Sequence, residues 1–259
     1  MKLTFLGTGT SFGVPVVGCD CNACRSNDLR DQRTRHGALL ELEGGTVLID
    51  TPPELRLQLL SAGIDNVDAV WFTHAHADHV HGIDDLRVFT VHLKKNLSAF
   101  VPSEYEEVIR NRFSYIFDDK YRPPEGTTKP EVRLFSFDPD ETPVVVGHRF
   151  EPVAVPHGPA TVYGFRVGGL GYITDGKYLP EAAMKTLNGV QVLVLNALWS
   201  GRPHPTHFNV EEALEVAQTV GAKHTYLTHL SHHVRHQDLV DQLPSGVLPA
   251  YDGLSIEII

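Results

Sequence analysis

Short apolar runs recur along the chain and alternate with amphipathic stretches, which predicts a mixture of strands and helices. The apolar runs have strand length and are rich in β-branched and aromatic residues. They are MKLTFL, ALLEL, TVLID, AVWFTH, EPVAVPH, GYITD, VQVLVLNA, HTYLTH and LSIEII. Their even distribution from one end of the chain to the other predicts that β-sheet runs through the whole protein.

Helical spacing marks several of the intervening segments. We expect helices over residues 52–63, 104–117, 210–221 and 236–243. Gly63 and Gly221 stand where a helix favours a terminal glycine, and Asn209 with Glu212 fits a capping box. Strands and helices joined by short connections, with no Ser/Gly linker and no internal repeat, predict one layered α/β domain over residues 1–259.

One region interrupts this rhythm. Residues from about 93 to 132 combine an amphipathic helix with the turn-rich sequence KYRPPEGTTKP. We interpret the region as an insertion that caps a site, because long excursions from a core are often functional. Arg112, Tyr115 and Tyr121 would then contact a substrate. The alternative is a surface excursion without a role in binding.

Composition places the chain among acidic globular proteins. Hydrophobic residues make up 42% and charged residues 21%, which excludes a disordered chain, and the formal net charge is −10. No apolar run approaches the length of a membrane span, and the opening MKLTFLGTGTSFG lacks the pattern of a signal peptide. We therefore expect a cytoplasmic protein without a membrane partner. Since phosphate binding needs clustered Lys and Arg, we expect no nucleic acid polymer as partner.

Histidine is the most informative residue type. Of the 15 histidines, many gather in THAHADHVHG (73–82) and THLSHHVRH (228–236). His74, His76, Asp78 and His79 form H-x-H-x-D-H directly after an apolar run, so they leave the end of a buried strand. Alternation along an extended segment would place the first three on one side and His79 on the other, which favours two adjacent metal ions. Imidazole with carboxylate favours zinc, manganese or iron over calcium.

Three further ligand-type residues stand in the same setting. His157, Asp175 and His229 each close an apolar run, as His74 does. Alone, each of them has an equal alternative as an ordinary polar residue at a strand end. Parallel strand ends at one site would bring all seven residues together, which predicts a dinuclear metal centre.

The three cysteines form a second cluster. Cys19, Cys21 and Cys24 lie close together, and an odd number of closely spaced thiols suits a metal better than disulfides. Three thiolates fit a tetrahedral structural zinc ion, for which no fourth ligand lies nearby in sequence. The alternative is three unpaired thiols.

The order of H-x-H-x-D-H, a lone His, an Asp and a final His resembles the metallo-β-lactamase superfamily. The segments FLGTGTSFGVP, GCDCNAC and LIDTPPE are similar to its cyclic-phosphate phosphodiesterase branch, known from the carbon–phosphorus lyase pathway. The resemblance runs from residue 1 to about residue 257 and is weakest across 93–150. It implies an α/β fold, a four-layer αββα sandwich, with the site at one edge between the two sheets.

The resemblance also implies ligand roles. The first divalent metal ion would be held by His74, His76 and His157. The second would be held by Asp78, His79 and His229, with Asp175 bridging the two. Asp50, in LIDT, would orient a ligand histidine, unless it is a simple turn residue. His232 would complete the structural zinc site with the cysteines, and the adjacent His233 is the competing ligand.

The implied activity is hydrolysis of a small cyclic phosphodiester, such as 5-phosphoribosyl 1,2-cyclic phosphate. Hydroxide bridging two zinc or manganese ions, held in part by Asp78, would attack phosphorus. His207, just before the helix expected near Val210, is the candidate proton donor and phosphate contact. Free backbone N–H groups at that helix start would help to hold the anion. His204 is interpreted as an exposed loop histidine.

Other functions share this metal core. The alternatives are a quinone-cofactor biosynthesis protein of the same branch, a carboxylic-ester or lactone hydrolase, and a non-catalytic metal-binding module. A transfer-RNA processing nuclease is disfavoured, because a chain at −10 shows no basic element to grip RNA. We expect a small phosphorylated substrate as partner, and a homodimer by analogy with the family. Substrate and metal identity do not follow from the sequence.

Overall fold

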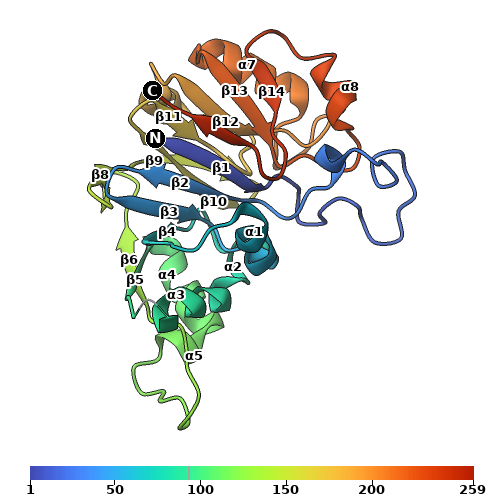
Figure 1. Ribbon diagram of the computed structural model, residues 1–259. Coiled ribbons are helices and arrows are strands. Elements are labelled where there is room, and N and C mark those ends of the chain that lie inside the picture. The colour runs from blue at the N-terminus through green and yellow to red at the C-terminus, as the bar shows by residue number, and fades with distance from the viewer. Residues whose placement is uncertain (93) are drawn as a thin grey trace.

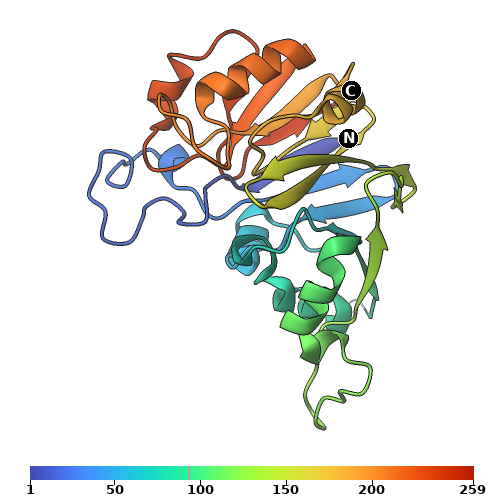
Figure 2. The ribbon, with the colours of Figure 1, turned by 180° about the vertical axis from the view of Figure 1, so that it is seen from behind.

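Two β-sheets pack face to face, and helices cover the outer face of each (Figure 1 and Figure 2). This arrangement comes from a computed structural model that describes residues 1–92 and 94–259. Leu93, the first residue of the predicted insertion, lies outside the described residues. The four layers are those of the predicted αββα sandwich.

The first sheet has seven strands. In spatial order they are β15 (Ser255–Glu257), β1 (Lys2–Gly7), β2 (Gly37–Leu42), β3 (Gly45–Ile49), β4 (Ala69–Trp71), β5 (Leu97–Pro102) and β6 (Val132–Phe137). Strands β15, β1, β2 and β3 pair antiparallel, and β3, β4, β5 and β6 pair parallel. The parallel half therefore brings the ends of β3 and β4 to the same edge.

The second sheet has six strands. In spatial order they are β14 (Val247–Pro249), β13 (His224–Thr228), β12 (Val192–Asn196), β11 (Leu170–Tyr172), β10 (Ala160–Val167) and β9 (Glu151–His157). Since β10 pairs antiparallel with both β9 and β11, those two run in one direction, and β12 and β13 run parallel to β11. A small hairpin, β7 (Val144–Val145) with β8 (His148–Arg149), stands apart.

Helices from the first half of the chain cover the first sheet, and those from the second half cover the second (Figure 1). The former are α1 (Leu55–Ala62), α2 (Ala77–Val80), α3 (Arg87–His92), α4 (Ser103–Arg112) and α5 (Ser114–Phe117). The latter are α6 (Glu181–Leu187), α7 (Val210–Val220) and α8 (His236–Val240). Two 3-10 turns, η1 (Leu29–Asp31) and η2 (Ile83–Leu86), complete the described elements. None of these helices is both long enough and apolar enough to cross a membrane.

Three apolar clusters fill the spaces between the layers. The central cluster lies between the sheets and contains the fully buried rings of Phe5, Trp71, Phe165 and Tyr172. A second cluster packs α1 to α5 on the first sheet, and a third packs α6 to α8 on the second. Trp71 also donates its indole N–H to the carbonyl of Tyr163 at 3.0 Å, which fixes β4 against β10. The two sheets thereby act as one rigid support.

The helix ends confirm the sequence signals. Gly63 and Gly221 adopt left-handed φ angles of 66° and 70° after α1 and α7. Asn209 accepts the Glu212 backbone N–H, and the Glu212 carboxylate accepts the Asn209 N–H, which is the predicted capping box.

The region from 94 to 132 differs from the expectation. The predicted helix over 104–117 is two helices, because the backbone leaves helical geometry at Phe113. The apolar run at 97–102 is strand β5, which lies inside the first sheet between β4 and β6. The excursion from the sheet is therefore shorter than predicted. Its turn-rich tip, near residues 118–131, projects from the body of the molecule (Figure 1).

Candidate metal centre

The predicted ligands lie where parallel strands end. His74 and His76 follow β4, and the same loop continues into α2, which carries Asp78 and His79. His157 is the last residue of β9, whereas Asp175 follows β11 and His229 follows β13. Because these strands of each sheet run in one direction, their ends bring the seven side chains together. The side chains form overlapping groups of three, and within each group the ligand atoms lie within 4.8 Å of one another.

The backbone turns sharply at three of these ends. Asp50, Asp175 and His229 have φ angles of 60°, 55° and 57°, in the left-handed region that non-glycine residues rarely adopt. Such conformations are unfavourable and persist where the surrounding structure enforces them, commonly at functional sites. Each of the three residues directly follows, or closely follows, a strand of the parallel region. Three of the five described non-glycine residues with positive φ therefore lie at the candidate metal centre.

The ligand atoms form two sets joined by one carboxylate. His74, His76 and His157 make the first set, and Asp78, His79 and His229 make the second. Asp175 spans them. Its Oδ2 lies 4.0 Å from His74 Nε2 and 3.5 Å from His79 Nε2, and its Oδ1 lies 3.2 Å from His229 Nε2.

The grouping of Asp78 corrects the expectation from alternation. That expectation placed Asp78 with His74 and His76, and His79 on the opposite side. In the structure Asp78 belongs with His79, because the chain leaves the extended conformation after His76 and begins α2 at Ala77. All seven predicted residues lie in these groups, and only their division by a strand-like period is wrong.

Asp50 orients two of the ligand histidines. Its Oδ2 accepts the His79 Nδ1–H at 2.6 Å and the Thr73 hydroxyl at 2.8 Å, and its Oδ1 accepts the Thr73 backbone N–H at 2.8 Å. Because the Thr73 hydroxyl donates to Asp50, it accepts from His74 Nδ1, which lies 3.0 Å away. Both rings then carry their proton on Nδ1 and leave the Nε2 lone pair free for a metal ion.

Other ring nitrogens are left in the same state. His157 Nδ1 lies 3.1 Å from the Thr206 carbonyl, to which it donates, so that its Nε2 is also free. The Nε2 atoms of His79 and His229 are buried and have no hydrogen-bond partner among the described residues. A buried polar atom without a partner costs about 1–3 kcal/mol. Divalent cations would satisfy these atoms, so the residues fit two metal ions.

Burial and charge prepare the centre for cations. Burial lowers the pKa of His74 well below its ordinary value and that of His229 to about 4, so both rings are neutral and able to bind a metal ion. Burial opposes charge on His79 too, but Asp175, Asp50 and Asp78 raise its pKa well above the ordinary value. The carboxylates therefore leave negative charge in the site that bound cations would balance.

His207 lies at the rim of the ligand cluster. Its Nε2 is 3.4 Å from Asp175 Oδ2, is buried, and has no hydrogen-bond partner among the described residues. Its Nδ1 lies 2.8 Å from the Thr206 hydroxyl. The side chain thus lies beside the candidate ligands, and its role as proton donor stays a prediction. It also forms a ligand-type group with His157 and Asp175, so the geometry allows a role in metal binding as well as in proton donation.

The start of α7 does not offer the predicted anion site. The Val210 N–H donates to the Trp199 carbonyl, and the Glu212 N–H donates to Asn209. Glu211 and Glu212 also place negative charge in the first turn. Because two of these amides are occupied and the charge is unfavourable for an anion, His207 is the part of this segment that faces the candidate centre.

Sequence reasoning missed His36. This histidine is buried, and its ring lies 5.6 Å from that of His79 and 6.1 Å from that of His229. Its Nε2 lies 2.9 Å from the Tyr172 hydroxyl. His36 therefore packs beside two histidines of the second ligand set. It precedes an apolar run instead of closing one, so the strand-end pattern that found the other histidines did not apply to it.

A cavity of about 410 Å³ opens beside the ligands. Its walls come from three segments beside the metal ligands themselves: Thr10 to Phe12, Leu198 to His207, and Ser231 to His233. None of its described lining residues comes from 94–132. From that region, Arg112 donates to the Ala75 carbonyl at 2.5 Å and so supports the metal-binding loop, whereas Tyr115 donates to Asp84. A capping role for the insertion stays a prediction.

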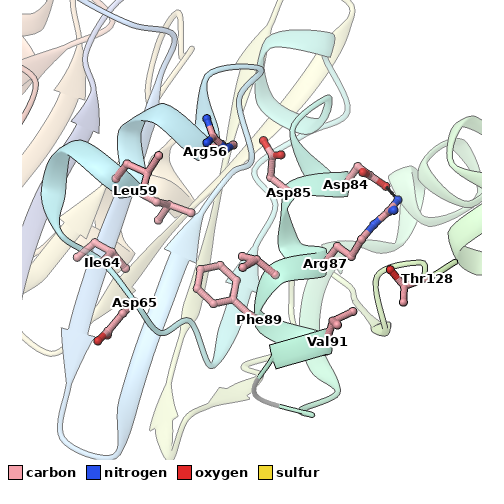
Figure 3. A pocket seen from close by; sticks show the side chains of 12 residues that line it. Arg56, Leu59, Ile64, Asp65, Asp84, Asp85, Arg87, Phe89, Val91 and Thr128 are labelled. Atoms are coloured by element: carbon pink, nitrogen blue, oxygen red, sulfur yellow. Dashed lines mark hydrogen bonds and ion pairs between the residues drawn. The ribbon is translucent and has the colours of Figure 1, made fainter. Parts of the chain in front are cut away.

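A larger cavity, of about 720 Å³, lies between α1 and α3 (Figure 3). Leu59, Ile64 and Phe89 form its apolar floor, and Arg56 and Asp85 stand at its rim. Its described lining contains no histidine and no cysteine. Size alone would favour this cavity, but the titratable and ligand-type groups converge on the smaller one.

The cysteine cluster forms a separate ligand group. Cys19, Cys21 and Cys24 make no disulfide, and their sulfur atoms lie 3.2, 3.5 and 3.8 Å from His232 Nδ1. His233 lies outside this group and packs against Trp199 instead. A hydrogen bond with the Cys24 backbone lowers the pKa of Cys21 to about 6, which favours the thiolate. Of the two histidines left open by the sequence, His232 is therefore the one that lies with the thiols.

Comparison with known proteins agrees with this geometry. A family model described as a β-lactamase superfamily domain matches residues 45–230. The chain therefore belongs to the β-lactamase superfamily and has its metallo-β-lactamase fold. Within that superfamily it belongs to the PhnP family. The crystal structure of a new diphosphatase from that family is 38% identical, with a TM-score of 0.90 over all of this chain and 98% of the other.

Two curated relatives carry other names. An octanoyltransferase of Porphyromonas gingivalis is 38% identical over 98% of this chain, but the chain spans only about half (51%) of that protein. A ribonuclease Z of Methanopyrus kandleri is 27% identical over 100% of this chain and 98% of its own length. Because the first match leaves half of the relative unmatched, its name describes a longer protein than the one matched here.

Replacing Asp50 by Asn should weaken metal binding about tenfold to a hundredfold, because the amide cannot hold both His79 and Thr73 in the metal-binding orientation. Competition with a chelator measures the affinity. Asp252→Asn is the matched control, since that carboxylate also accepts hydrogen bonds from threonines, Thr8 and Thr34, but outside the ligand groups. Equal affinities in Asp50→Asn and the unaltered protein would contradict the orienting role.

Replacing Cys21 by Ser should remove tightly bound zinc from the cysteine cluster while the metal at the histidine centre remains, because the two ligand groups share no residue. Metal analysis of purified protein measures the change. His233→Ala should retain the full metal content and His232→Ala should lose the same zinc as Cys21→Ser. An unchanged total in Cys21→Ser would mean that the thiols hold no metal ion.

Proposed function

We propose that the protein is a phosphodiesterase that hydrolyses a small, cyclic phosphodiester with two divalent metal ions. The observation that carries the proposal is the convergence of two ligand sets on Asp175, with His207 beside them and a cavity in front. Substrates of this class include 5-phosphoribosyl 1,2-cyclic phosphate and 2′,3′-cyclic nucleotides. Two similar proteins are named for cleaving bonds at phosphorus, a diphosphatase and a ribonuclease, which supports the choice of phosphate chemistry.

Each group of residues has its own role in the proposed reaction. Zinc or manganese ions, when bound, supply hydroxide from water at neutral pH and screen the negative charge of the phosphate oxygens. His74, His76 and His157 would hold one ion, Asp78, His79 and His229 the other, and Asp175 would lie between them. Asp50 keeps the rings of His74 and His79 in the orientation that binds metal.

His207 is the proposed proton donor. Breaking a P–O ester bond leaves an alkoxide that needs a proton, and the buried, unpartnered Nε2 of His207 faces the region between the ligand sets. The Thr206 hydroxyl contacts Nδ1 and so fixes the ring. The same nitrogen that donates the proton would first contact a phosphate oxygen, which makes His207 a substrate-binding residue as well.

A small substrate fits the cavity and the charge better than an RNA chain does. The cavity volume of about 410 Å³ is in the range of small-molecule sites. The net charge of −10 disfavours a long polyanion, whose binding needs a basic surface. The name of the ribonuclease relative therefore supports cleavage of a bond at phosphorus, and it does not support an RNA chain as the substrate.

Phosphorus NMR tests the activity. Metal-loaded protein should open the ring of 5-phosphoribosyl 1,2-cyclic phosphate, of a 2′,3′-cyclic nucleotide, or of both. Asp78→Ala should abolish the reaction, because it removes a ligand of the second set. If both substrates survive although two metal ions are bound, the phosphodiesterase proposal is wrong. A carboxylic-ester hydrolase or a quinone-cofactor biosynthesis protein would then be the next hypothesis.

His207→Ala should slow hydrolysis of a diester with a poor leaving group by roughly a hundredfold or more, and should slow one with a nitrophenolate leaving group far less. The reason is that a stable leaving anion needs no proton. Steady-state kinetics with both substrates measures the difference, and His224→Ala, an exposed histidine at the start of β13, serves as control. A loss of bound metal in His207→Ala would instead identify His207 as a metal ligand.

A further inference from the structure

Phe12 stands at the mouth of the cavity with 74% of its surface exposed. Single exposed apolar side chains are common and need no explanation by themselves. Phe12 differs because it lines the same cavity as the ligands His76, Asp78 and His157. A large aromatic ring is therefore presented to solvent directly in front of the metal centre.

The ring is held there by an anchored turn. The Gly13 N–H donates to the Thr10 carbonyl at 2.8 Å, and the Phe12 N–H donates to the Thr10 hydroxyl at 3.4 Å. Arg35 Nε donates to the Ser11 carbonyl at 2.8 Å. On either side, the Gly9 and Val14 N–H groups donate to the backbone of the neighbouring segment 33–34. Because hydrogen bonds hold the turn at its tip and at both ends, the backbone that carries Phe12 is already in place before a ligand binds.

Trp199, in the cavity-lining segment 198–207, already has partners for its indole ring. Trp199 donates its indole N–H to the Arg202 carbonyl at 2.8 Å, and the Arg202 guanidinium lies 5.2 Å from the ring. His204 and His233 meet the same indole at 5.3 and 5.4 Å. By contrast, no aromatic or cation–π partner is found for Phe12 within residues 1–92 and 94–259. Phe12 is thus the aromatic side chain of the cavity that remains open to a ligand.

The chemistry of the walls favours an uncharged planar ring. Apart from the metal ligands Asp78 and Asp175, the described lining contains no Lys, Arg, Asp or Glu, so it offers no fixed cation for a second phosphate. The lining does offer a neutral hydrogen-bond donor. The Thr206 N–H donates to His204 Nδ1, so His204 carries its proton on Nε2 and can donate it to an acceptor. A nucleobase combines a flat face with acceptor atoms at its edge.

We propose that Phe12 is a specificity-determining residue that stacks on the planar base of the substrate, so that the preferred substrates are nucleoside phosphodiesters and not sugar phosphates without a base. The inference rests on the proposed function, and it narrows the substrate class of the same site. Stacking on an aromatic side chain tolerates different bases, because every base has a π face. We therefore expect selectivity for the presence of a base and little selectivity among bases.

The test compares two substrates and a set of Phe12 variants. Phe12→Ala should raise KM for adenosine 2′,3′-cyclic phosphate about tenfold with little change in kcat, which is within the range of one lost base–aromatic stack. KM for 5-phosphoribosyl 1,2-cyclic phosphate should stay within about twofold of the unaltered protein, because that substrate has no base to stack. Phe12→Tyr should behave as the unaltered protein does. Val17→Ala is the control, since Val17 is fully exposed but does not line the cavity.

Binding of adenosine monophosphate, measured by calorimetry, separates the two proposals. Its affinity should fall in Phe12→Ala by the same factor as the rise in KM. If the unaltered protein hydrolyses neither substrate, the proposed function fails, and the calorimetry alone decides whether Phe12 stacks. Equal affinity in both proteins, no binding to either, or an equal rise in KM for both substrates would overturn the stacking role.

Discussion

The buried carboxylate of Asp50 is the group that holds the candidate metal centre together. It lies at the end of β3 and binds the Thr73 backbone, the Thr73 hydroxyl and His79, so it joins the ends of two parallel strands to the first turn of α2. Burial raises its pKa, and the contacts with His79 and Thr73 oppose that effect. A buried charge of this kind is tolerated only when positive charge and donors balance it. Metal ions bound by His74 and His79 would add to that balance, and metal binding is thereby coupled to the stability of the fold.

A second constraint joins the two predicted metal sites through one short segment. His229 belongs to the dinuclear set, and His232 lies with Cys19, Cys21 and Cys24. The segment between them, after β13, also places Ser231 and His233 in the cavity wall. A zinc ion in the cysteine cluster would therefore fix the projecting N-terminal loop (Figure 1) and one wall of the cavity together. A structural zinc ion at this place would therefore support the cavity wall without contacting a substrate.

The strand-end pattern predicted which side chains would lie together, because it expresses a property of the fold. Strands that run in one direction place their ends at one edge of a sheet, which brings His157, Asp175 and His229 to one edge of the second sheet. The packing of the two sheets then brings His74 of the first sheet to the same place. Features that depend on three-dimensional packing did not follow from the pattern. Because α2 starts at Ala77, Asp78 lies with His79 and not with His74 and His76 as alternation predicted. His36 precedes a strand in the sequence, yet its ring lies beside that of His79. The strand at 97–102 was hidden in a segment whose neighbours are helical, since a single apolar run does not distinguish core strand from insertion.

The candidate metal ligands and the cavity walls are supported by different parts of the fold, and this difference affects specificity. The candidate metal ligands follow strands that are fixed by the core between the sheets, so their arrangement changes little without loss of the fold. The walls that meet the substrate come from connecting segments, the turn at 10–13 and the segment 198–207, where substitutions cost less. A superfamily built in this way can keep one reaction centre and vary the group that the centre acts on. Phe12 illustrates the point, because its ring is exposed and contributes little to the core, yet it lines the cavity beside the candidate ligands. A substitution at such a position would change the cavity wall with little effect on the core.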